Sequence, residues 1–169
     1  MRISEGVEWA AHCAVLLAAV PEGASLPAAR LAEFHGIPTP YLAKALQALT
    51  RAGIVESTAG HYGGYRLAGP ASGISMLDIF EAIEGTEPAF RCTEIRRRGP
   101  SAVPVRAYSP TCGIAAAMWR AEAAWRSELE HTTIADIAHE VTAQAPQAAI
   151  ARGGVWLTGV LRSRSPLGS

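Results

Sequence analysis

The segment from residue 27 to residue 68 constrains the fold most, because its pattern changes from helix to strand partway along. Two short helices are predicted over 27–34 and 39–51, joined by a turn at Gly36-Ile37-Pro38. The residues at 54–57 and 65–68 then read as two short strands around a stretch with three glycines, which predicts a β-hairpin. Two helices joined by a tight turn and followed by a hairpin form a winged helix-turn-helix.

Composition narrows the class of function. The chain has 169 residues, of which 49% are hydrophobic and 18% charged, so it is long enough for one globular domain. Its 15 basic and 15 acidic residues exclude a polybasic nucleic-acid binder, yet allow a DNA-reading module whose basic face is balanced elsewhere. We find no nucleophile–base motif, no P-loop and no GxGxxG, so the sequence does not indicate an enzyme.

The remaining segments predict a mainly α-helical chain with a small β-wing, divided into four regions. Helices over 4–19 and 75–84 complete a winged-helix region at 1–87. A proline-rich loop at 88–111 has no apolar period and carries a net charge of +4 within 91–106. A long helix at 112–130 and a shorter one at 134–141 form a region at 112–145. Residues 146–169 show no clear period, and we expect a tail that is ordered only if it docks on something.

The winged helix predicts which side chains meet double-stranded DNA. The second helix of the motif would enter the major groove, where Gln47 can read adenine while Lys44 and Tyr41 contact phosphate. The wing would reach an adjacent minor groove. The predicted DNA-binding residues are Thr39, Pro40, Tyr41, Lys44, Gln47, His61, Tyr62 and Arg66.

The long helix at 112–130 predicts a homodimer. Its wide apolar stripe includes two tryptophans, and a compact winged helix has few places to bury so long a helix. Pairing with the same helix of a second subunit solves this problem and gives a two-fold dimer. Such a dimer of DNA readers implies a palindromic operator.

Three cysteines suggest chemistry beyond DNA binding. The apolar run at 10–20 is too short to cross a membrane and has no signal-peptide pattern, so we predict a cytoplasmic protein in which cysteines are thiols or metal ligands. Cys13 falls on an apolar helix face and is predicted to be a buried small hydrophobe. Cys92 and Cys112 flank the arginine-bearing loop but form no CxxC pair, so they give weak support for zinc.

Glu8 and His12 are four residues apart and share one face of the first predicted helix. Two interpretations stay open for this pair. It could chelate a metal, or it could be an ordinary helical ion pair, which the residues alone favour.

Three segments resemble a known family: YLAKAL at 41–46, LTRAGIVES at 49–57 and GHYGGYRLA at 60–68. They are similar to the reading helix and wing of the Rrf-type winged-helix regulators, the family of IscR and NsrR, over about residues 1–142. The resemblance implies a dimeric transcription factor, a repressor, whose iron–sulfur cluster controls its affinity for DNA.

The cluster ligands depart from the usual pattern, which has three cysteines in a short loop. The loop here has only Cys92 and Cys112, but EGVEWAAHC at 5–13 resembles the first helix of the RsrR-type redox regulators of this family. This resemblance implies a [2Fe–2S] cluster held by Cys92, Cys112 and the Glu8 and His12 side chains of the other subunit. We hypothesise that Trp9, beside Glu8, reports the redox state through a side-chain movement.

An alternative function remains. A cluster-free winged-helix repressor could sense a small molecule or oxidation of Cys92 and Cys112 to a disulfide. A winged helix that binds protein would show no salt-dependent affinity for duplex DNA.

Overall fold

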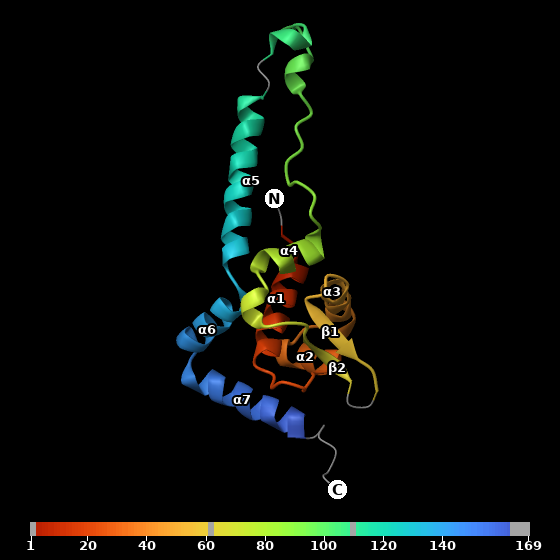
Figure 1. The fold of residues 1–169 in the computed structure, drawn as a ribbon, viewed down its shortest axis with the longest axis vertical. Coiled ribbons are helices and arrows are strands. Elements are labelled where there is room, and N and C mark those ends of the chain that lie inside the picture. Colours follow the sequence, from red (N-terminus) through yellow and green to blue (C-terminus); the bar gives the residue numbers. More distant parts are fainter. Residues whose placement is uncertain (1–2, 61–62, 109–110, 163–169) are drawn as a thin grey trace.

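The computed structural model describes residues 3–60, 63–108 and 111–162. Figure 1 shows a body built from the N-terminal helices and the hairpin, and an arm that extends away from it, made of one long helix and the loop before it. The fold is mainly helical with one two-stranded sheet, which confirms the predicted fold class.

Three helices form the core of the body: α1 (Glu5–Ala18), α2 (Ala28–His35) and α3 (Thr39–Arg51). Gly36 ends α2 with φ 66°, a left-handed conformation that glycine adopts without a steric penalty. Thr39 is the first residue of α3, and Pro38 precedes it at the N-cap. The largest fully buried side chains are mostly aliphatic, among them Leu26, Leu31, Leu42, Leu46 and Leu49.

The hairpin consists of β1 (Val55–Thr58) and β2 (Gly64–Leu67), which pair antiparallel with Val55 opposite Leu67. Tyr65 also forms a bridge with Leu26, which joins the hairpin to the segment before α2. A Cβ atom on Gly64 would lie 2.6 Å from the carbonyl oxygen of Leu26, so only glycine permits this close approach. The wing is therefore attached to the helical core at its base.

The helices α4 (Met76–Glu84) and α6 (Ile134–Gln144) lie beside the core, and both begin with the same N-terminal capping motif. Ser75 and Asp78 form a capping box at α4, and Thr133 and Asp136 form one at α6. Ser75 and Thr133 are also joined by a β-bridge, so the two helix starts lie together. This contact fixes α6, which packs against α1, to the first half of the chain.

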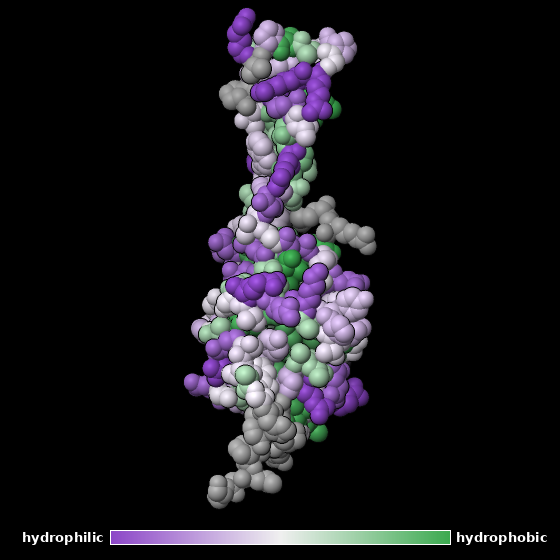
Figure 2. Space-filling model, turned by 90° about the vertical axis from the view of Figure 1, so that its right-hand side faces the viewer, coloured by the Kyte–Doolittle hydropathy of each residue, from purple (hydrophilic) through white to green (hydrophobic). Residues whose placement is uncertain are grey.

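The arm consists of α5 (Gly113–His131) and the loop before it, which has single turns of 3-10 helix at Ile95–Arg97 and Val105–Ala107. Only the C-terminal part of α5 is fixed to the body, by a Phe80–Trp125 ring contact at 5.0 Å and a 2.5 Å ion pair between Arg126 and Glu81. Ala115 is the only buried residue of α5. Figure 2 shows strongly hydrophilic residues around the tip of the arm, with hydrophobic ones between them. Large apolar side chains of the arm are exposed: Ile95, Ile114, Met118 and Trp119.

The sequence predicts a C-terminal tail after Pro146, because no helical or strand spacing of apolar residues is clear there. The structure differs from this prediction. The segment forms α7 (Gln147–Arg162), which lies against the body (Figure 1). The Trp156 ring lies 4.9 Å from the Phe34 ring of α2, and its Nε1 donates to the Glu33 carboxylate at 3.2 Å. Residues 147–162 of the predicted tail are thus ordered by docking, and residues 163–169 lie outside the described residues.

Candidate DNA interface and cysteine pocket

The helix α3 separates its buried and exposed residues cleanly. Leu42, Ala45, Leu46, Ala48 and Leu49 are buried on the side that faces the core. The side chains predicted to meet DNA are all exposed: Thr39, Pro40, Tyr41, Lys44 and Gln47. Their shared exposure leaves one face of α3 free for a partner, as a reading helix requires.

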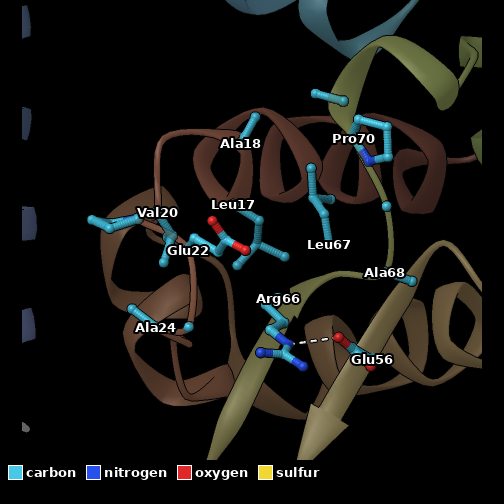
Figure 3. Close-up of a pocket in the computed structure, with 14 residues that line it drawn as sticks. Leu17, Ala18, Val20, Glu22, Ala24, Glu56, Arg66, Leu67, Ala68 and Pro70 are labelled. Carbon is cyan, nitrogen blue, oxygen red and sulfur yellow. Dashed lines mark hydrogen bonds and ion pairs between the residues drawn. The ribbon is translucent and has the colours of Figure 1, made fainter.

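In the wing, the predicted DNA-binding residue Arg66 forms an ion pair within the chain. Its guanidinium lies 2.5 Å from the Glu56 carboxylate, directly across the hairpin (Figure 3). The pair lies at the edge of an open pocket of about 600 Å³ that the end of α1 and the base of the hairpin form. A phosphate contact by Arg66 would therefore compete with Glu56. The predicted wing residues His61 and Tyr62 lie outside the described residues.

Cys92 and Cys112, twenty positions apart in sequence, line one pocket of about 450 Å³ in the arm. Both thiols are half-buried. Cys112 is also the N-cap residue of α5, so it lies at the positive end of that helix dipole. The structure thus brings the two loop cysteines together where negative charge is stabilised.

Charged side chains surround these thiols. The Cys92 sulfur lies 3.5 Å from the Glu94 carboxylate and accepts a 3.4 Å hydrogen bond from the Glu94 backbone. Arg96 binds both Glu94 oxygens at 2.9 Å, and this contact lowers the pKa of Glu94. The hydrogen bond to Glu94 raises the pKa of Arg96, with smaller contributions from Cys112 and Cys92. The Nε atom of Arg96 is buried and has no partner among the described residues.

Sequence reasoning missed the role of Glu94, which it counted only as a charge. Glu94 has φ 50°, and among the described residues it is the only non-glycine with positive φ. This backbone places its carboxylate between Cys92 and Arg96. Only its position two residues after Cys92 could have pointed to this contact.

Glu8 and His12 are both exposed on one face of α1, as their spacing predicted, but neither lines the cysteine pocket, and His12 lines a different one. The His12 ring lies 5.6 Å from the His35 ring of α2. Burial, and then the charge of His12, lower the pKa of His35. Among the described residues of this single chain, no three metal-binding side chains come together.

Two further residues of α1 were singled out in the sequence, Cys13 as a core residue and Trp9 as a redox reporter, and the role of Trp9 stays a prediction. Cys13 is fully buried, which raises the pKa of its thiol to about 12 and confirms its place in the core. Trp9 is half-buried and meets the Tyr41 ring edge-on at 6.2 Å. Trp9 thereby connects the helix that bears Glu8 and His12 to the exposed face of α3.

No helix within the described residues is long and apolar enough to cross a membrane. The predicted cytoplasmic location stays a prediction.

Comparison with solved structures finds the same fold. IscR of T. potens has a TM-score of 0.64 at 22% identity, covering 89% of this chain and 96% of that one. The oxidised form of CymR from Staphylococcus aureus has a TM-score of 0.59 at 25% identity, covering 82% and 96%.

Comparison by sequence identifies the family. Residues 3–140 match the Rrf2 family, described as an iron-dependent transcriptional regulator. A protein of Mycobacterium tuberculosis named as an HTH-type transcriptional regulator is 35% identical over 139 residues, which cover 82% of this chain and 81% of the relative. Protein aau3 of Rhizobium meliloti is 34% identical over 138 residues, or 81% and 84%. With its winged helix and exposed α3 face, the chain belongs to the Rrf2 family of DNA-binding transcriptional regulators and is not an enzyme.

Proposed function

We propose that this chain is a homodimeric redox sensor that binds a palindromic operator and holds a [2Fe–2S] cluster at each of two equivalent sites. Cys92 and Cys112 of one subunit and Glu8 and His12 of the other would be the ligands. One observation carries the proposal: two cysteines far apart in sequence line one pocket beside Arg96 and the N-terminus of α5.

The residues present fit such a group. Two thiolates suit one iron, and imidazole with carboxylate suits the other. The buried Arg96 Nε has no partner among the described residues, and the Arg96 guanidinium interacts electrostatically with both cysteines. Among the described residues of one chain, no three metal-binding side chains come together, and in this proposal Glu8 and His12 of a second subunit complete the site.

The bound cluster supplies a one-electron change of charge without leaving the protein. The role of this chain is to hold the thiolates and to transmit the change. Arg96 and the α5 dipole stabilise negative charge at Cys92 and Cys112. On α1, the ring contact between Trp9 and Tyr41 connects the helix of Glu8 and His12 to the DNA-reading face, so a shift of Trp9 would move Tyr41.

On DNA, we propose that α3 enters the major groove with the exposed face that carries Gln47 and Lys44. The other proposed contacts are Thr39, Pro40, Tyr41 and the wing residues His61, Tyr62 and Arg66. Arg66 would have to exchange Glu56 for phosphate.

The first test is the visible spectrum and iron content of the anaerobically purified protein before and after dithionite. We expect a coloured protein that bleaches on reduction and contains two irons per chain. A colourless, iron-free protein that binds DNA equally under both conditions would falsify the sensor mechanism.

A mixed dimer tests the shared ligand set. One chain carries Cys92→Ser and Cys112→Ser, and the other carries Glu8→Ala and His12→Ala. If the ligands come from two subunits, the mixed dimer keeps one intact site and about half of the iron, while each variant alone keeps none. No iron in the mixed dimer would show that all ligands belong to one chain.

A second candidate function rests on the same pocket. Because Cys92 and Cys112 line it together, an oxidant of the peroxide class could take two electrons and leave a disulfide without any metal. CymR of Staphylococcus aureus, whose fold matches, has been crystallised in an oxidised form. This function predicts an iron-free protein that loses two titratable thiols, and its DNA affinity, on oxidation. A small-molecule signal would leave both thiols unchanged.

A further inference from the structure

A cavity of about 470 Å³ lies between the winged helix and the C-terminal helices, away from the pocket of Cys92 and Cys112. The helices α1, α2, α6 and α7 all contribute to its wall. Phe34 lines it from α2, Val141 from α6, and Ile150 and Leu157 from α7. Its size falls within the range of small-molecule sites, and its wall is largely apolar.

The cavity has one polar end. His12 and His35 line it with their rings 5.6 Å apart. The Nε2 atom of His35 is shielded from solvent and has no hydrogen-bond partner among the described residues. A shielded polar atom without a partner is costly, so a ligand that supplies the missing hydrogen bond gains affinity.

The chemistry of the wall restricts the ligand. No Asp, Glu, Lys or Arg is among the residues that line the cavity, so a charged ligand would lose its hydration without gaining a counter-ion. The aromatic ring of Phe34 and the aliphatic side chains of α7 favour a flat apolar body.

We propose that this cavity binds a neutral aromatic molecule with one hydroxyl or carbonyl oxygen, the phenol or quinone class, with that oxygen at His35 Nε2. Such a ligand would contact both α7 and α2 of the helix-turn-helix. It would lie next to Phe34, whose ring also contacts Trp156 of α7. It gives the regulator an input besides the cysteine pocket. The cavity lies in the body, apart from both loop cysteines, and shares only His12 with the proposed cluster ligands.

The test compares two probes of nearly the same shape, 2-naphthol and naphthalene, titrated calorimetrically into the full-length protein as purified. We expect 2-naphthol to bind about five- to tenfold more tightly, the effect of one hydrogen bond. In His35→Phe, which keeps a ring but removes the polar atom, the two probes should bind equally. If the wild-type protein does not prefer 2-naphthol, or His35→Phe retains the preference, the proposal is wrong.

A second pair of variants tests the cavity itself. Gly154 lines it and has open space where a side chain would begin, so Gly154→Leu should fill it and weaken 2-naphthol binding at least tenfold. Gly159→Leu makes the same change in α7 away from the cavity and should bind like wild type. If both variants bind 2-naphthol equally well, the proposal is wrong. Equal binding is also the result expected if another part of the chain or a second copy already fills the cavity.

The same titration on a chain with Cys92→Ser and Cys112→Ser separates this inference from the proposed sensor. We expect unchanged binding of 2-naphthol, since neither cysteine lines the cavity. Loss of binding there would contradict the proposal, whereas loss of iron alone bears only on the cluster.

Discussion

The body and the arm of this molecule differ in the exposure of their large apolar side chains, which are mostly buried in the body and mostly exposed in the arm. In the body, Leu31, Leu46 and Ile79 are completely buried, and the hairpin is attached to the core through Leu26. In the arm, α5 buries only Ala115, while Ile114 is 71% exposed and Trp119 45%. The body buries its large apolar side chains against one another, whereas the arm leaves an apolar surface that a second subunit would cover in the proposed dimer. The two half-buried cysteines lie in the arm.

The largest expected difference between the two regions is in thiol reactivity. In iron-free protein at pH 8, iodoacetamide should label Cys92 and Cys112 at least about a thousandfold faster than Cys13, because only the thiolate reacts. The pKa of about 12 keeps Cys13 protonated at this pH, and its burial blocks access. Peptide mass spectrometry measures the rates. In concentrated urea all three should react alike, and a native Cys13 that reacts as fast as Cys112 would contradict the described core.

Removing apolar volume should matter only where the side chain is buried. Leu46→Ala empties a fully buried position, so the free energy of unfolding should fall by about 2–5 kcal/mol. Urea denaturation followed by circular dichroism measures this change. Val155→Ala, at a position 76% exposed on α7, is the matched control and should change stability by less than about 0.5 kcal/mol. A similar loss of unfolding free energy in both variants would contradict the assignment of Leu46 as buried and Val155 as exposed.

Charge on the arm should affect assembly rather than folding. Trp119→Glu should raise the dimer dissociation constant about thirtyfold or more, since a buried tryptophan often dominates an interface. Sedimentation equilibrium measures the constant, and circular dichroism should stay unchanged. Val155→Glu places the same charge on α7 and should leave assembly intact. If both variants remain equally dimeric, Trp119 lies outside the interface.

The smallest expected effect concerns the wing. Glu56→Gln releases Arg66, so affinity for operator DNA should rise about two- to fivefold and fall more steeply with salt. Fluorescence anisotropy at several salt concentrations measures both quantities. In a chain that already carries Arg66→Gln, Glu56→Gln should no longer make the affinity for operator DNA more dependent on salt. If Glu56→Gln raises the affinity equally in that chain, Arg66 is not the cause of the increase.

The winged helix was largely predictable because local signals agree there. The glycine at the end of α2, the proline near the start of α3 and the apolar spacing within α3 all act over a few residues. The exposure of the apolar stripe on α5 also followed from the sequence, since a helix of that length exceeds what a small core can cover. These elements depend little on distant contacts.

Other features depend on contacts that no local pattern encodes. The docking of α7 rests on Trp156 meeting Phe34 and Glu33 more than a hundred positions away. The pairing of Arg66 with Glu56 required the strand register, and the place of Glu94 required its left-handed backbone. The meeting of Cys92 and Cys112 in one pocket came from the fold, whereas their assignment as ligands came from resemblance.

The attachment of α5 by one end has a mechanical consequence. At 1.5 Å per residue, the roughly 14 residues from Arg126 back to Cys112 span about 21 Å, so a tilt of about 5° at Arg126 displaces the Cys112 end by about 1.8 Å. Trp125 and Arg126 hold the fulcrum against α4, and Cys112 lies at the far end of the lever. A slight rotation of the DNA-reading body is thereby magnified at the thiols.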